Sequence, residues 1–156
     1  VSLPNGVSTT TFSNTLNATF EITGVQLEAG EVATPFQNED IGTTLRKCQR
    51  YYNRMSADNA YSMWGAGFTY TTSQAKINIP FPVEMRTTPT LGQSANSTLA
   101  VFSVSTYAFS SDATINNPSS WGTNITCFTS GLTVGRGAVI MANNDASAYL
   151  EFKAEL

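Results

Sequence analysis

Hydrophobic and polar side chains alternate most regularly at the end of the chain. Over residues 146–156 every second residue is alanine, leucine or phenylalanine, and the residues between them are serine, tyrosine, glutamate or lysine. A period of two puts alternate side chains on opposite faces of a strand, so this pattern predicts a strand with one buried and one wet face. Shorter apolar stretches predict further strands near residues 61–72, 77–81, 99–102, 125–128 and 138–141.

One stretch has a helical period instead. Its apolar side chains are Ile41, Leu45, Cys48, Tyr52 and Met55. Spacings of three and four residues place side chains on one face of a helix, so the pattern predicts a helix over residues 43–54, capped by Asp40 or Thr43. Its basic side chains, Arg46, Lys47, Arg50 and Arg54, lie mostly off this stripe. They suit either a solvated face near the helix C-terminus, which we favour, or a patch for a phosphate or acidic glycan.

The remaining N-terminal part predicts a strand over residues 18–28, with a bulge at Gly24, and a loop over residues 29–38. Short strands separated by turn residues favour an antiparallel sandwich. We therefore predict an all-β fold: a jelly-roll-like antiparallel β-sandwich with one short N-terminal helix. The expected organisation is a terminal strand and linker of an upstream β domain (1–38), a connecting helix (39–55) and a C-terminal sandwich module (56–156).

Composition removes several classes of function. The chain has 156 residues, a net charge of −3 and only 12% charged residues, while Thr, Ser and Asn are abundant. Nucleic-acid binding needs clustered cations, so no nucleic-acid partner is expected. No apolar run approaches the ~20 residues that span a bilayer, so membrane insertion is not expected either. Because the first residue is Val1 rather than Met, we expect a processed or excerpted part of a longer protein.

The sequence offers no catalytic or metal-binding constellation, and we predict a non-enzymatic protein without a cofactor. Histidine is absent, which removes the usual base for a serine or cysteine nucleophile. Carboxylates are too sparse for the acid–base pair of a glycosidase. Residues 143–145, Asn-Asn-Asp, suit a turn better than a calcium site. The glycine-rich residues 131–137 lack a phosphate-loop ending and predict a hairpin.

The two cysteines are Cys48 and Cys127. Two thiols so far apart in sequence define no disulfide framework. Pairing is one alternative, but free cysteine is among the most buried residue types, so we favour two unpaired, buried side chains.

Residues 106–122 are the best candidate for a binding site. They combine aromatic side chains with short amides and hydroxyls, the combination that holds a sugar through ring faces and a few placed hydrogen bonds. The alternative is that the aromatics belong to the core and the polar residues to turns. The candidate ligand-binding residues are Tyr107, Phe109, Asn116, Asn117 and Trp121.

Residues 22–52 carry a recognisable motif. It reads Ile-Thr-Gly-Val-Gln-Leu-Glu-Ala-Gly from Ile22, Ala-Thr-Pro-Phe from Ala33, and Leu45 followed by Cys-Gln-Arg-Tyr-Tyr from Cys48. This resembles a signature of bacteriophage tail-fibre and related virion proteins. The Pro-Phe-Pro-Val stretch from Pro80 and the final Phe-Lys-Ala-Glu-Leu fit the same module. Gln37 and Thr44 depart from it, since the family commonly has glutamate at both places.

The resemblance implies a structural and adhesive protein on the virion surface, in a tail fibre or another external appendage. It implies a homotrimer that contacts other virion proteins and, through a receptor-binding module, host surface polysaccharide. The alternative is a purely structural virion component, a fibre adaptor or a capsid-surface decoration protein, without receptor binding. The motif residues mark a fold and imply no active site.

Overall fold

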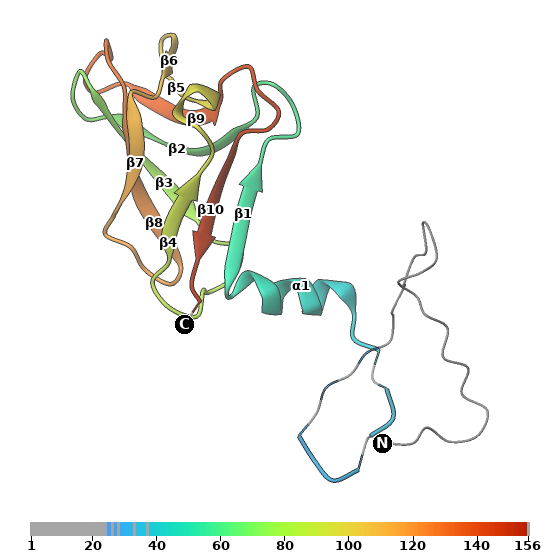
Figure 1. Cartoon of the computed structure of the whole chain (residues 1–156). Helices are drawn as coiled ribbons and strands as arrows, with labels where there is room; N and C mark the ends of the chain where they lie inside the picture. Colours follow the sequence, from blue (N-terminus) through green and yellow to red (C-terminus); the bar gives the residue numbers. More distant parts are fainter. Residues whose placement is uncertain (1–24, 26, 28, 33, 37, 156) are drawn as a thin grey trace, which may run out of the picture. The chain divides into compact units, whose positions relative to one another are not determined.

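The computed structural model describes residues 25, 27, 29–32, 34–36 and 38–155 (Figure 1). The chain divides into two units, Val1–Asn38 and Glu39–Leu156, and every helix and strand described lies in the second. Most of the strand predicted over residues 18–28 lies outside the described residues; Val25 and Leu27 are described and are not in a strand. The described residues between 29 and 38 contain no helix or strand, as the predicted loop requires.

The predicted helix exists but has different ends. Helix α1 spans Ile41–Gln49, and the Asp40 side chain caps it by accepting a hydrogen bond from the Thr43 amide at 3.1 Å. The prediction that it continues to residue 54 is wrong. The helix ends at Gln49, and strand β1 (Tyr52–Ser56) follows and pairs with the last strand, β10. Tertiary strand pairing outweighs the helical period of the sequence. Tyr52 and Met55 therefore do not extend the helix stripe.

Over the described residues, ten strands form two antiparallel sheets, which confirms the predicted all-β sandwich with one short helix (Figure 1). The first sheet has three strands in the order β1-β10-β4, and the second has seven in the order β6-β5-β9-β2-β3-β8-β7. The bounds of the other elements are β2 Met63–Thr69, β3 Gln74–Pro80, β4 Thr90–Gln93, η2 (a short 3-10 helix) Asn96–Thr98, β5 Leu99–Phe102, β6 Thr106–Ala108, β7 Ser111–Asn116, β8 Gly122–Phe128, β9 Gly137–Ala142 and β10 Tyr149–Lys153.

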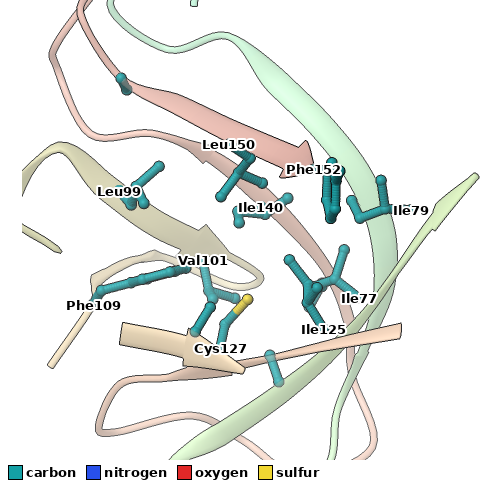
Figure 2. Packing of buried hydrophobic residues seen from close by; sticks show 14 of the residues in the cluster. Ile77, Ile79, Leu99, Val101, Phe109, Ile125, Cys127, Ile140, Leu150 and Phe152 are labelled. Carbon is teal, nitrogen blue, oxygen red and sulfur yellow. The ribbon is translucent and has the colours of Figure 1, made fainter. Parts of the chain in front are cut away.

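The core lies between the two sheets (Figure 2). Strand β10 follows the predicted alternation: Leu150 and Phe152 are fully buried, while Lys153 is exposed. Ile77 and Ile79 of β3 and Ile125 of β8 face them from the larger sheet. Burying such side chains supplies most of the free energy that favours folding, about 1.5–3 kcal/mol for each large aliphatic or aromatic group.

Both cysteines are free, as predicted. Cys127 lies in the core, where burial raises the pKa of its thiol to about 12. The prediction that Cys48 is buried is wrong, because it lies on α1, a helix with no buried residue.

The glycine-rich residues 131–137 do not form a hairpin, which corrects the prediction. Strands β8 and β9, which they connect, are separated in the sheet by β3 and β2. The loop instead crosses the end of the β2–β3 hairpin. There the Leu132 amide donates to the Thr72 carbonyl at 3.0 Å, and the Gly135 amide donates to the Thr69 carbonyl at 2.9 Å. None of the described helices is long and apolar enough to cross a membrane.

Candidate functional site

A short loop, residues 117–121, joins the neighbouring strands β7 and β8 and carries an exposed tryptophan. Trp121 is 64% exposed, which is unusual for the largest apolar side chain. Its backbone is nevertheless held firmly. The Phe81 amide donates to the Trp121 carbonyl at 3.0 Å, and the Met85 amide donates to the Ser120 carbonyl at 2.7 Å. The fold therefore fixes the base of the indole and leaves its face to solvent.

Two features shape the turn itself. Asn117 has a φ of +46°, in the left-handed region that asparagine tolerates better than most residues. The Ser119 hydroxyl donates to the Gly122 carbonyl at 2.8 Å and accepts from the Trp121 amide at 3.3 Å. These bonds close the loop over the first residue of β8.

Beside this loop is an open groove of about 420 Å³ on the outer face of the seven-stranded sheet. Its floor comes from β3 and β8, where Asn78 pairs with Asn124 and Pro80 with Gly122. The lining residues are uncharged: Asn78, Pro80, Asn117, Ser119, Trp121, Gly122, Thr123 and Asn124. We call this the Trp121 groove. It combines one aromatic face with amides and hydroxyls that can donate and accept hydrogen bonds.

Two of the five candidate residues, Trp121 and Asn117, line this groove. Asn116 is adjacent on β7, but its amide donates to the Thr126 hydroxyl. Phe109 is only 6% exposed and belongs to the core, where no ligand reaches it. Tyr107 is half-buried on β6, packs against the core and lies near Gly131 rather than the groove. The structure therefore places the C-terminal end of the candidate segment, Asn117 and Trp121, at the groove, and its N-terminal end, Tyr107 and Phe109, away from it.

Sequence reasoning missed Thr123 and the three outward-facing groove residues on strands, Asn78, Pro80 and Asn124. Thr123 is buried, and the other three follow the strand alternation: Asn78 lies between Ile77 and Ile79, and Asn124 precedes Ile125. That alternation shows that they face outward. It does not show that β3 and β8 are neighbours, which is what brings Asn78 next to Asn124.

A cluster of charged contacts lies away from the groove, on the outer face of the three-stranded sheet. Glu151 accepts from the Lys153 ammonium at 2.7 Å and from the Tyr52 hydroxyl at 2.6 Å. The hydrogen bond from Lys153, followed by that from Tyr52, lowers the pKa of the Glu151 carboxyl. The Arg54 guanidinium lies 3.8 Å from the centre of the Tyr149 ring. The contacts of Tyr52 with Glu151 and of Arg54 with Tyr149 join β1 to β10, and none of these residues lines the Trp121 groove.

The basic residues of the helix region do not converge on a site. Arg46, Lys47, Arg50 and Arg54 are all exposed, and Lys47 pairs with Glu39. Residues 143–145 form a turn, in which Asn144 has a φ of +53° and Asp145 accepts from the Ser147 amide at 2.7 Å. Over the described part of the chain, no three histidine, cysteine, aspartate or glutamate side chains are grouped so that they could hold a metal ion.

No protein-family model, no curated protein and no solved structure matches this chain.

Proposed function

We propose that this chain is a non-enzymatic binding module of a phage virion surface and that it holds host cell-surface glycan in the Trp121 groove. The observation that carries the proposal is a loop, anchored through Ser119, Ser120 and Trp121, that presents a 64% exposed indole beside uncharged amides and hydroxyls. An exposed aromatic side chain on a fixed backbone loses little freedom on binding, so its contact area contributes to affinity.

A glycan fits this chemistry better than a peptide or an ion. One face of a pyranose ring is apolar and stacks on an indole, while its hydroxyls bind amides such as those of Asn78 and Asn124. The groove lining contains no charged side chain, which favours an uncharged sugar. It also contains no carboxylate, and glycoside hydrolysis requires a pair of them. We therefore propose binding without cleavage.

The virion assignment rests on the motif of residues 22–52 and its resemblance to tail-fibre proteins. It places the chain, as a proposal, on an external appendage in contact with other virion proteins.

Self-association has support of its own in α1. Ile41, Leu45 and Cys48 are spaced by four and three residues and are all exposed, Ile41 at 84% and Leu45 at 55%. These spacings match the a and d positions of a single coiled-coil heptad, a surface that another copy of the same helix can cover. We propose a homo-oligomer, with three chains as the number that the fibre resemblance implies. Three grooves on one particle would raise a weak sugar affinity through multivalency.

A purely structural virion component is the second candidate. The exposed stripe of α1 favours it as well, because an assembly surface is needed in either case. The two candidates differ in whether the Trp121 groove binds anything.

The test is binding to a panel of immobilised bacterial surface oligosaccharides, including those of the host of the parent phage. We expect Trp121→Ala to weaken binding at least tenfold, a change of about 1.4 kcal/mol. The matched control is Tyr70→Ala. Tyr70 is also an exposed aromatic residue, at 52%, but lies at the opposite end of β3 from Pro80. Folded, assembled wild-type protein that binds no member of the panel and does not block phage adsorption would favour the structural candidate.

A further inference from the structure

The register of the seven-stranded sheet aligns one residue from each strand in a single row. Each member is the cross-strand partner of the next, so the row runs perpendicular to the strands. In sheet order the row is Asn116, Asn124, Asn78, Ala66, Val139, Phe102 and Thr106. None of the seven is buried, whereas their chain neighbours Ile77, Ile125 and Ile140 are. The row therefore lies on the outer face.

The row has two chemically different halves. Asn116, Asn124 and Asn78 put three amides side by side on β7, β8 and β3. Asn124 and Asn78 line the Trp121 groove, while the amide nitrogen of Asn116 donates to the Thr126 hydroxyl and leaves its oxygen for a ligand. Ala66, Val139 and Phe102 continue it as an apolar strip on β2, β9 and β5.

A second hollow, of about 310 Å³, lies over this strip. The small residues Ala66 and Gly137 form part of its floor. Phe102, which is 40% exposed, lines the side farthest from the Trp121 groove. The hollow meets the Trp121 groove where Ala66 pairs with Asn78. The two hollows are thus consecutive parts of one surface.

The row carries no charge. On β3 the next outward side chain is Lys76, whose ammonium lies 4.2 Å from the centre of the Tyr70 ring. The Tyr70 amide donates to the Gln74 carbonyl, so Tyr70 lies at the end of β3 away from Asn78. A ligand along the row therefore meets amides, then apolar surface, then the Thr106 hydroxyl, and no ion. That sequence of groups complements an uncharged chain with hydroxyl edges and apolar ring faces.

The length of the row shows whether it suits a polysaccharide or a single sugar. Strands lie about 4.8 Å apart, so the six steps from Asn116 to Thr106 cover roughly 29 Å. One sugar residue in a chain advances by about one strand spacing, so several consecutive residues fit. We infer that the Trp121 groove is one end of an extended site for an unbranched, uncharged polysaccharide, which runs across the strands from Trp121 to Phe102. This inference rests on the proposed function and specifies its ligand.

The experiment measures affinity against ligand length. From the polysaccharide that wild-type protein binds, a series from disaccharide to octasaccharide is prepared and titrated by calorimetry. We expect wild-type affinity to rise with length. Phe102→Ala should lower affinity for the longest fragments at least fivefold and leave the shortest unchanged. Ala66→Arg, which places a long side chain in the middle of the row, should have the same effect. Val134→Ala, in the loop over residues 131–137, serves as an exposed apolar control.

Each outcome decides a separate point. The extended site is overturned if affinity does not depend on ligand length and Phe102→Ala does not change it. If Trp121→Ala still abolishes binding in that case, the proposed function stands. Failure of the wild-type protein to bind any member of the oligosaccharide panel, which precedes the length series, overturns the proposed function. A fall in oligomer mass in Phe102→Ala, with sugar affinity unchanged, overturns the extended site and makes the apolar strip a contact between copies of the chain.

Discussion

At the scale of single residues, Trp121 shows how a fold presents a side chain without burying it. The hydrogen bonds that fix it go to its backbone and to that of Ser120, so the ring contributes little to holding the loop. Replacing the indole should therefore cost affinity rather than stability. Replacing Phe109 should instead cost stability, because its ring is part of the core.

Glu151 gives a prediction about acid stability. Its pKa is lowered in the folded chain, first by Lys153 and then by Tyr52, from an ordinary value of 4.5. A carboxyl group with a lowered folded pKa adds stability above its unfolded pKa, and this contribution is lost as pH falls through the folded value. We expect Glu151→Gln to be less stable than wild type near neutral pH and to lose less stability on acidification below 4.5.

The measurement is the melting temperature as a function of pH for both proteins. The pKa values of Glu39, Asp58 and Asp145 are also lowered, so the variant should keep part of the acid transition. Parallel curves for the two proteins across the acid range would contradict the role assigned to Glu151.

At the scale of elements, two glycines on neighbouring strands should respond in opposite ways. A Cβ on Gly67 of β2 would overlap the carbonyl oxygen of Lys76 in β3, whereas a Cβ on Gly137 of β9 would meet nothing within 4 Å. We expect Gly67→Ala to lower the free energy of unfolding by about 1–3 kcal/mol through overpacking. Gly137→Ala should leave it unchanged or raise it by up to about 1 kcal/mol.

Urea unfolding of the two variants checks this, with equal denaturant slopes required for the comparison. Equal stabilities would mean that β2 and β3 can separate locally without cost, and would contradict the close approach at Gly67.

The elements also show what the sequence could predict. Strand β10 was predictable because its alternation is long and one face is buried. The end of α1 was not, because Tyr52 and Met55 fit a helical stripe and a strand equally well, and only pairing with β10 decides between them. Likewise, Trp121 and Asn117 were predictable as loop residues, but Asn78 joins them through the β3–β8 register, which no local pattern encodes.

For the whole molecule, the proposed self-association through the exposed stripe of α1 can be tested by substitution. We expect Leu45→Asp to place a charge in the seam between copies and to reduce the particle, measured by light scattering, from several chains to one. Thr43→Asp adds the same charge away from Leu45 and near the helix N-terminus, where an acidic group is favourable, and should leave the mass unchanged.

The reactivity of Cys48 provides a second measurement of the expected dissociation into single chains. Its thiol lies on the stripe, so it should react slowly with a thiol reagent in the assembled protein and faster in Leu45→Asp, while Cys127 stays unreactive in both. A wild-type protein that is a single chain at high concentration, with Cys48 freely reactive, would refute the assembly.

The link between α1 and the sandwich has a mechanical consequence. The helix leads into β1, an edge strand paired along its length with β10, from Tyr52 opposite Lys153 to Ser56 opposite Tyr149. A pull transmitted through α1 acts along β1 and loads these backbone bonds together, in shear, rather than unzipping them one by one. In a particle tethered through α1 and attached at the Trp121 groove, the time for which the tether holds would be set by an unfolding rate rather than by the equilibrium free energy of the fold.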